Sequence, residues 1–343
     1  MLGIRADANG IIASGHVMRC IAIAEQIEKS GGSVIFITAD YFSEELLNQR
    51  GFKHVCLESD WQNKILELDA LNSVIREYCI TALLVDSYQV TKEYLQTLHK
   101  LVKVAYIDDL YMFEYPVDMI INYAMDADQS AYESYRDHFV QLLIGPKYTP
   151  LRKEFQNIKF QVNTEVKNVM ITTGGSDNYH IILRIVKKIA NLNKWNHFCF
   201  HIIVGGFFSC EDVTSLENLC VNHENIILHK NIKNMAEIME KCDLGVSAGG
   251  TTLAEICACG LPSICFAIAD NQLDGVRSYG KYGIMACVGD IRQNLDAGIE
   301  AIFVQIELLK NSYDIRMQYS NQCSKFIDGR GAKRIAEQLL QLD

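Results

Sequence analysis

Apolar residues gather along the chain into short runs, and longer segments with helical spacing separate these runs. The runs are nearly continuous rather than alternating with polar residues, which is typical of parallel strands buried on both faces. A very short strand precedes the first loop. The further runs predict strands at 34–38, 82–86, 102–107, 119–122, 169–172, 198–204, 225–229, 244–247 and 263–267.

Helical spacing is clearest between the first two predicted strands. One apolar face repeats at i, i+3, i+4, i+7 and i+10, through Val17, Cys20, Ile21, Ala24 and Ile27. Gly31 and Gly32 are expected to end this helix. Strands that alternate with helices predict an α/β fold with parallel sheets.

The strand–helix series falls into two halves. The 343 residues suggest two domains at about 150 residues each, and the polar stretch 145–165 carries no strong strand. We therefore predict two doubly wound, Rossmann-like domains facing each other across a cleft, with ligands beyond the carboxyl ends of their strands. The expected divisions are 1–150, 151–320 and a C-terminal helical segment, 321–343, which packs back on the first domain.

Charge and hydropathy exclude several classes of protein. The net charge is −10, and no cluster of Lys and Arg forms the basic stripe of a nucleic-acid binder. No apolar run reaches the 18 residues of a membrane span, and the first residues lack the pattern of a secretory signal. Neither a nucleic-acid nor a membrane partner is expected, and nothing in the sequence assigns an oligomeric state.

The 12 cysteines are interpreted as reduced thiols rather than disulfides. No CxxC occurs, so zinc and thioredoxin-type sites are disfavoured. Six cysteines lie in apolar segments, where a thiol packs as a small hydrophobe: Cys199, Cys242, Cys257, Cys259, Cys265 and Cys287. A cytoplasmic protein is the simplest expectation.

The first segment that could carry chemistry runs from the first strand into the first helix. It reads RADANGIIASGHVMR, from Arg5 to Arg19, and places Ser14, Gly15 and His16 at the helix start. A positive helix end disfavours imidazolium, so His16 is a candidate general base. The alternative is a plain loop with an N-cap serine and a surface histidine.

Two glycine-bearing turns suit a diphosphate. Gly174 and Gly175 lie in TTGGSD, and Gly249, Gly250 and Thr251 lead into a helix whose N-terminus could bind an anion. Glu255, one turn into that helix, could accept hydrogen bonds from a ribose diol, while Asn271 and Gln272 open the next helix at the same sheet edge. The alternative is a pair of ordinary glycine turns.

Acidic residues follow two further strands, in Asp86-Ser87-Tyr88 and Asp108-Asp109. Paired aspartates can hold a metal, but they are at least as often caps and turn formers. The sequence has no HExxH, Walker lysine or EF-hand pattern. We expect no metal and no cofactor.

Four stretches together resemble one known family: RADA…SGHVMRC at the start, GPKYTPLRKEF at 145–155, TTGGSD at 172–177 and SAGGTTLAEICACGLPSI…DNQ at 247–272. The family is the UDP-sugar hydrolase of pseudaminic acid biosynthesis (PseG). It shares the two-domain GT-B fold of the glycosyltransferase that makes lipid II. The resemblance implies release of UDP from UDP-2,4-diacetamido-2,4,6-trideoxy-β-L-altropyranose, without a metal.

The resemblance also implies roles for individual residues. His16 is expected to act as the base on water. Two residues depart from the family pattern: Ala13 stands where the family usually has glycine, and His180 where it tends to have asparagine. The expected sugar-binding residues are Arg5, Asp7, Gly15, Arg19, Tyr88 and Asn271. The expected UDP-binding residues are Gly174, Gly175, Ile232, Gly249, Gly250, Thr251, Glu255 and Gln272.

Three other functions remain open. A glycosyltransferase with a UDP-amino sugar donor would use the same nucleotide half and an acceptor hydroxyl in place of water. A non-catalytic sugar-nucleotide sensor would keep Glu255 and the glycine turns but would not need His16. An epimerase of UDP-amino sugars would need several acids and bases around C2, which the sequence does not identify.

Overall fold

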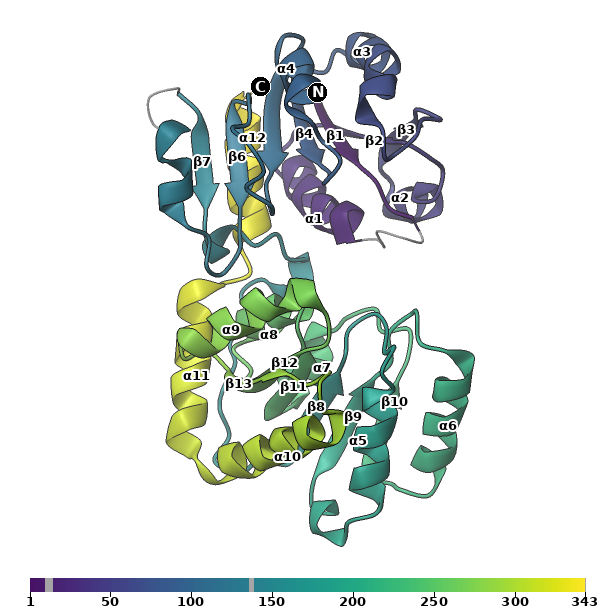
Figure 1. The fold of residues 1–343 in the computed structure, drawn as a ribbon, viewed down its shortest axis with the longest axis vertical. Coiled ribbons are helices and arrows are strands. Elements are labelled where there is room, and N and C mark those ends of the chain that lie inside the picture. The colour runs from purple at the N-terminus through teal and green to yellow at the C-terminus, as the bar shows by residue number, and fades with distance from the viewer. Residues whose placement is uncertain (10–14, 136–138, 343) are drawn as a thin grey trace. The chain divides into compact units, whose positions relative to one another are not determined.

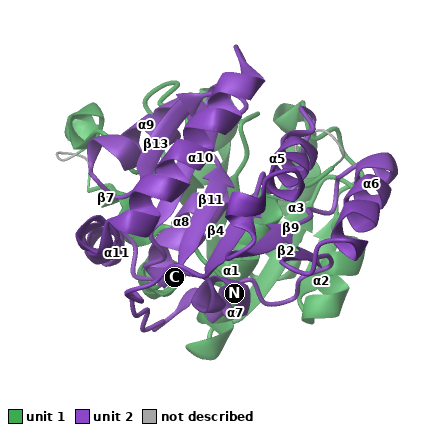
Figure 2. Cartoon of the chain, turned by 90° about the horizontal axis from the view of Figure 1, so that it is seen from below, with its two compact units in different colours: residues 1–153, 330–343 green, residues 154–329 purple. Residues whose placement is uncertain are grey.

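The computed structural model describes residues 1–9, 15–135 and 139–342, which form two compact units (Figure 1). Unit 1 comprises Met1–Lys153 and Arg330–Asp343, and unit 2 comprises Glu154–Gly329 (Figure 2). The division falls three residues after the boundary expected at 150, and the chain returns to unit 1 at its end. Each unit is built on its own parallel sheet, so the predicted fold class of two parallel-sheet α/β domains is confirmed.

Unit 1 contains a parallel sheet in the order β3-β2-β1-β4-β5-β6-β7. Its central strands are entirely buried, as the near-continuous apolar runs predict. The strands are β1 (Leu2–Ala6), β2 (Val34–Thr38), β3 (Lys53–Cys56), β4 (Ala82–Asp86), β5 (Lys103–Ile107), β6 (Met119–Asn122) and β7 (Gln141–Ile144). The helices are α1 (Gly15–Lys29), α2 (Glu44–Arg50), η1 (Lys64–Glu67), α3 (Leu68–Glu77), α4 (Lys92–His99), η2 (Gln129–Tyr135), η3 (Pro146–Tyr148) and α12 (Gly331–Leu342).

Unit 2 contains a parallel sheet in the order β10-β9-β8-β11-β12-β13. In each sheet the order reverses beside the first strand, at β1/β4 and at β8/β11, which is where doubly wound sheets bind ligands. The strands are β8 (Asn168–Thr172), β9 (Cys199–Ile203), β10 (Ile226–His229), β11 (Leu244–Ala248), β12 (Ser263–Ala267) and β13 (Ala286–Asp290). The helices are α5 (Ile181–Ala190), η5 (Asn193–Trp195), α6 (Cys210–Val221), α7 (Ala236–Lys241), α8 (Thr251–Cys259), η6 (Asp270–Gln272), α9 (Leu273–Lys281), α10 (Leu295–Asn311) and α11 (Tyr313–Phe326); η4 (Lys153–Phe155) spans the boundary.

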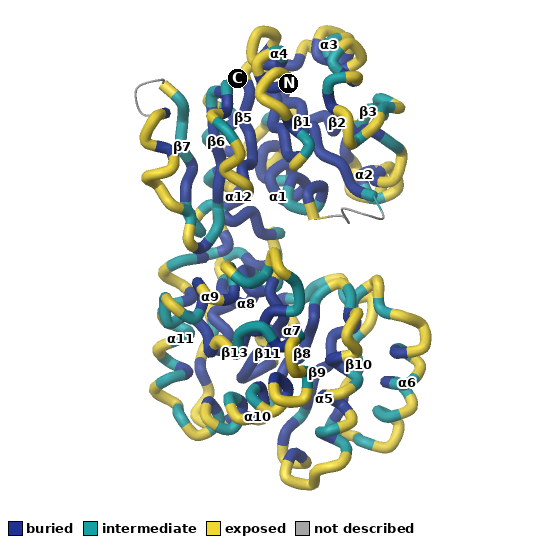
Figure 3. The backbone as a smooth tube through the Cα atoms, viewed as in Figure 1, coloured by how far each residue is buried: buried dark blue, intermediate teal, exposed yellow. Residues whose placement is uncertain are grey.

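The strands that the sequence analysis did not predict lie at sheet edges. β3, β7 and β13 each contain exposed or half-buried residues (Figure 3). An edge strand is covered less completely than a central one, so its apolar run is shorter and weaker. The predicted strands at 34–38, 82–86, 119–122 and 263–267 are confirmed to the residue.

The C-terminal segment is divided rather than continuous. α11 ends at Phe326 in unit 2, and α12 begins at Gly331 in unit 1, so residues 321–343 do not form one helix. α12 packs against α1, where Ala332, Ile335 and Leu339 join the core of unit 1.

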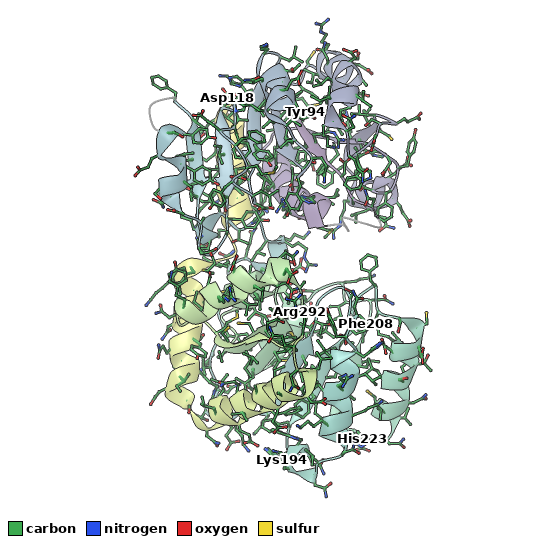
Figure 4. The ribbon with its side chains drawn as sticks, viewed as in Figure 1. Tyr94, Asp118, Lys194, Phe208, His223 and Arg292 are labelled. Carbon is green, nitrogen blue, oxygen red and sulfur yellow. The ribbon has the colours of Figure 1, made fainter. Side chains whose placement is uncertain are left out.

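Beside β1 the core of unit 1 encloses a network of ion pairs. The Arg5 guanidinium donates to both oxygens of Glu67 (2.8 and 2.7 Å) and to Asp7 (2.5 Å). Lys64 donates to the second Asp7 oxygen, and the Tyr94 hydroxyl donates to Glu67 (2.8 Å; Tyr94 is labelled in Figure 4). All five side chains are buried. The network therefore ties β1 to η1 and α4.

We predict that Glu67→Ala destabilises unit 1 by about 3–5 kcal/mol, because it leaves the buried Arg5 guanidinium without its bidentate partner. Burial would raise the pKa of Glu67, but Arg5 holds that pKa below its usual value. This contribution is therefore present above about pH 4.3 and is lost as the pH falls. Thermal unfolding should show a variant that is much less stable than the wild type at pH 7. The difference in stability between the two should become smaller in acid.

Glu25→Ala is the matched control, because Glu25 pairs with Arg50 at the surface. Exposed pairs contribute at most about 1 kcal/mol. Equal losses in the two variants would contradict a structural role for the buried network.

Candidate active site

The start of α1 and the end of β4 hold an imidazole–carboxylate pair. His16 is the second residue of α1, and its Nδ1 lies 2.6 Å from Oδ1 of Asp86, the last residue of β4. His16 is 7% exposed and Asp86 is 1% exposed. The two elements meet because α1 follows β1, the strand that pairs with β4 at the point where the strand order reverses.

Arg19 holds Asp86 in its charged form. It lies one helical turn beyond His16 and donates to both Asp86 oxygens, through Nε (2.5 Å) and through a second, shorter contact. Burial alone would raise the pKa of Asp86, but Arg19 and His16 lower it far below its usual value. An ionised carboxylate can only accept hydrogen bonds.

This charge state defines the tautomer of His16. Because Asp86 only accepts and lies closer to Nδ1 of His16 (2.6 Å) than Arg19 does (3.1 Å), Nδ1 donates to the carboxylate, and in the neutral ring the lone pair lies on Nε2. Within the described part of the chain, Nε2 has no hydrogen-bond partner. The ring therefore presents a basic nitrogen in a fixed orientation, as general-base catalysis requires.

The carboxyl ends of β4, β5 and β6 supply the side chains around this pair. The Tyr88 ring meets His16 edge-on, with centroids 4.6 Å apart, and its hydroxyl donates to Asp109 (2.9 Å). Arg19 also donates to Asp109 (2.8 Å) and to the Tyr123 hydroxyl. Three neighbouring strands of one parallel sheet thus deliver polar side chains to one place.

The other predicted sugar-binding residues of this segment lie apart from that pair. Arg5 is fully buried and Asp7 is 4% exposed, and both are committed to the ion-pair network. In this structure they are structural residues with no accessible group for a sugar. Gly15 is the exposed first residue of α1. The rest of the predicted loop, 10–14, lies outside the described residues, as does the family departure at Ala13.

In unit 2, two helices begin beside the reversal of strand order, and their first turns differ. At α5 the buried Asp177 carboxylate accepts from the amides of Ile181 and Ile182 (2.9 and 2.7 Å), so this helix start already holds an anionic group. At α8 the preceding residue is Gly250, no side chain caps the helix, and the first turn has no acidic residue. The amides at the start of α5 are therefore occupied by the protein itself, whereas α8 presents an uncapped start.

The turn after β8 packs closely against the backbone at Gly205. Gly174 has a φ of +88° and donates to Thr172 Oγ1 (3.0 Å). A Cβ on Gly205 would lie 2.2 Å from the Gly174 carbonyl oxygen and 2.4 Å from that of Gly175. The Thr173 hydroxyl in the same turn is buried without a hydrogen-bond partner among the described residues.

The turn after β11 brings together two predicted UDP-binding residues. A Cβ on Gly249 would lie 2.7 Å from the Gln272 side chain, and Gly250 has a φ of +137° that favours glycine. The Gln272 side chain accepts from the Ile268 amide (2.9 Å), which fixes the turn after β12. Thr251 is exposed as the first residue of α8.

The remaining predicted residues lie at the same end of the sheet or near it. Glu255 lies one turn into α8 and is half-buried, and Asn271 is exposed in η6. Arg292, labelled in Figure 4, donates to both Asp290 and Asp270 and so fixes the start of η6. Ile232 follows β10, an edge strand that β9 separates from β8.

The family departure at His180 has a local explanation. His180 precedes α5 with a φ of +53° and its Nδ1 lies 2.8 Å from Asp212. Asparagine adopts this left-handed conformation more readily than most residues, and histidine is also enriched there. The departure thus preserves the backbone turn.

The structure assigns positions to aspartates that the sequence analysis left open. Asp86 belongs to the His16 pair. Asp108 is buried and accepts from the Tyr115 and Tyr132 hydroxyls (2.8 and 2.6 Å), so it is a structural residue. The Asp109 carboxylate accepts hydrogen bonds from Arg19 and from the Tyr88 hydroxyl. The position of these aspartates after apolar strands indicated in the sequence that they lie at the sheet edge. The sequence alone does not show which hydrogen-bond partner each aspartate has.

The described residues contain neither a cluster of metal ligands nor a membrane-spanning helix. No three His, Cys, Asp or Glu side chains within 1–9, 15–135 and 139–342 are grouped so as to hold a metal ion. Over the same ranges, no helix has the length and apolar character needed to cross a membrane. The cysteines are all free thiols; of the six expected to pack as small hydrophobes, four are buried, Cys199 is half-buried and Cys287 is exposed.

Comparisons with known proteins give one family match over part of the chain and relatives at 25% identity. Residues 169–274, from β8 to the start of α9, match the glycosyltransferase family 28 C-terminal domain. The chain is 25% identical over its full length to 70% of the uncharacterized protein MJ1062 of Methanocaldococcus jannaschii. It is also 25% identical, over 79% of its length, to 45% of a Helicobacter pylori protein named pseudaminic acid cytidylyltransferase and UDP-2,4-diacetamido-2,4,6-trideoxy-β-L-altropyranose hydrolase.

Solved structures share the fold at low identity. The MurG structure from Acinetobacter baumannii superposes with a TM-score of 0.71 at 11% identity, covering 99% of both chains. The UDP-GlcNAc 2-epimerase of Neisseria meningitidis, bound to UDP-GlcNAc, gives a TM-score of 0.65 at 13% identity, covering 99% of this chain and 100% of that one. The chain therefore has the GT-B fold of glycosyltransferases such as MurG, built from two parallel-sheet α/β domains.

Proposed function

We propose that the protein hydrolyses a UDP-linked diacetamido-trideoxy sugar to UDP and free sugar, without a metal, as a step of nonulosonic acid formation. The observation that carries this proposal is the His16–Asp86 pair, in which an ionised carboxylate holds the Nδ1 proton and leaves Nε2 basic. Supporting it, the Helicobacter pylori relative is named for this hydrolysis, and the motifs around His16 resemble that family.

The proposed reaction is a single displacement. Nε2 of His16 takes a proton from water, the water oxygen attacks the anomeric carbon, and the bond from that carbon to the UDP oxygen breaks. UDP departs with both electrons of that bond and with its bridging oxygen. Asp86 is a positioning residue in this step, because it orients the imidazole and stabilises the imidazolium that forms.

Unit 2 is proposed to bind UDP through its uncapped helix start. The amides of the first turn of α8, beyond Gly250, would face the diphosphate and stabilise the charge on departing UDP. Glu255 is proposed to accept from the ribose diol, and the backbone at Ile232 to read the uracil. Asn271 would contact the sugar.

A glycosyltransferase with a UDP-amino sugar donor is the second candidate. The match of residues 169–274 to the family 28 C-terminal domain and the MurG-like fold favour it. The two functions differ in the nucleophile. Release of UDP from the sugar nucleotide in buffer without an acceptor supports hydrolysis, and release only after addition of an acceptor alcohol supports transfer.

Replacing the proposed base and replacing a proposed UDP-binding residue should change different quantities. We predict that His16→Ala lowers kcat by about 10²- to 10⁴-fold and leaves UDP affinity unchanged, because a general base acts only in the chemical step. Glu255→Ala should instead weaken UDP binding by about one to two decades, the loss of a charge-assisted hydrogen bond. Steady-state kinetics and calorimetry with UDP separate these effects.

Asp86→Asn tests the positioning role in the same assays. An amide in place of the carboxylate no longer fixes the tautomer of His16, so kcat should fall and its pH profile should change while UDP affinity is retained. Near-full turnover in His16→Ala, or an unaltered pH profile in Asp86→Asn, would contradict the proposed base.

Neighbouring glycines test the turn after β8. We predict that Gly205→Ala weakens UDP binding by about tenfold or more, because its Cβ forces the Gly174 and Gly175 carbonyls to move. Gly206→Ala is the matched control, since a Cβ there meets no atom within 4 Å. Equal UDP affinity in the two variants would contradict a role for this turn in UDP binding.

Isotope labelling tests which bond breaks. Attack at the anomeric carbon in H2¹⁸O should put the label in the free sugar and none in UDP. Proton NMR before mutarotation should show only the inverted anomer. Label in UDP would indicate attack at phosphorus, and a retained anomer would indicate a double displacement.

A further inference from the structure

Asp109 uses its two carboxylate oxygens unequally. Oδ2 accepts from Arg19 (2.8 Å) and from the Tyr88 hydroxyl (2.9 Å). Oδ1 accepts from no residue that the structure describes. The side chain is 22% exposed, so one oxygen is held rigidly by protein donors while the other remains an available acceptor.

The side chains around Asp109 carry a net negative charge. Asp86 and Asp109 contribute two negative charges and Arg19 one positive charge. Burial raises the pKa of Tyr88 and of Tyr123, so both phenols stay neutral. All three guanidinium nitrogens of Arg19 already donate to Asp86, Asp109 or Tyr123. Within the described residues of this group, no cation is left to pair with an acidic ligand.

An apolar surface adjoins the available oxygen. The Tyr88 side chain is 40% exposed and lies between the His16 ring, 4.6 Å away, and the Asp109 carboxylate that its hydroxyl contacts. Leu110, the next residue after Asp109, is 44% exposed. Exposed aromatic surface with a few fixed polar groups suits a sugar ring, whose C–H faces pack on aromatic carbon while its substituents form hydrogen bonds.

We propose that Asp109 determines specificity for the sugar, as the acceptor of a hydrogen bond from an N–H or O–H substituent, and that it restricts the substrate to uncharged sugars. This inference rests on the proposed function. An N-acetyl or hydroxyl group satisfies Oδ1, whereas a sugar carboxylate would face a like charge with no cation to offset it. Tyr88 supplies the packing surface, and its hydroxyl keeps Oδ2 in place.

UDP-glucose and UDP-glucuronate provide a direct test, because they differ only in a hydroxymethyl group and a carboxylate at C5. In calorimetric titrations the wild-type chain should bind UDP-glucose about 10- to 100-fold more tightly than UDP-glucuronate. Asp109→Asn keeps the size of the side chain and removes its charge. In this variant the preference should largely disappear, mainly through tighter binding of UDP-glucuronate.

Glu58→Gln is the matched control. Glu58 accepts from the Tyr41 hydroxyl in an exposed tyrosine–carboxylate pair of the same unit. It should keep the wild-type preference. Equal binding of the two nucleotides by the wild type, or an undiminished preference in Asp109→Asn, would overturn the assignment of Asp109.

The charge preference also separates this inference from the proposed hydrolysis. Turnover of the diacetamido sugar nucleotide without the charge preference overturns the role of Asp109 alone. The charge preference without turnover supports that role and overturns hydrolysis alone.

Discussion

A buried, ionised carboxylate at the end of β4 is the interaction on which the candidate site in unit 1 depends. Asp86 is almost completely removed from water, and a lone carboxylate there would become protonated. Arg19 prevents this by contacting both oxygens. The ionised state in turn holds the proton on Nδ1 of His16 and makes Nε2 basic.

Arg19 has a second consequence for the same group. Its remaining nitrogen contacts Asp109 and Tyr123, so one guanidinium links the ends of β4, β5 and β6. A planar, permanently charged group can do this, whereas the single ammonium of a lysine could not contact both carboxylates with the same geometry. The group that stabilises the base is therefore also the one that positions the proposed sugar-binding carboxylate.

Much of the fold follows from the sequence because parallel strands buried on both faces produce long apolar runs. The central strands of both sheets are of this kind, and their positions were predictable. β3, β7 and β13 were missed because edge strands are only partly covered and need fewer apolar residues. The break between α11 and α12 was missed for another reason. Both segments have helical spacing, and the return of the chain to unit 1 is a tertiary contact that local pattern does not encode.

The candidate site was predictable in its residue types more than in its pairings. His16 at a helix start and the glycines before α8 follow from local sequence. Arg5 and Asp7 were expected at the sugar, but the structure pairs them with Glu67 and Lys64, which lie some sixty residues further along the chain. The same limit applies to Asp177. Its place before α5 resembles a ligand turn in sequence, and only the structure shows that its carboxylate occupies the helix amides itself.

Under the proposed function, the distinction between hydrolysis and transfer lies in unit 1, although the family match lies in unit 2. Residues 169–274 match a glycosyltransferase domain, but that stretch ends before α10 and includes no part of the His16 group. Its glycine turns and helix start are suited to a nucleoside diphosphate, which a hydrolase and a transferase release alike. The nucleophile is chosen where the base is. In unit 1 the His16 ring lies edge-on to a tyrosine whose hydroxyl is already bonded to Asp109, so under the proposed function the adjoining polar groups are committed to one another and to the sugar. A water molecule needs only the base and one further contact, whereas an acceptor alcohol needs a binding surface of its own. Under the proposed function, the residues after β4 and β5 therefore decide whether water or an alcohol attacks, whereas the glycine turns of unit 2 would serve a hydrolase and a transferase alike.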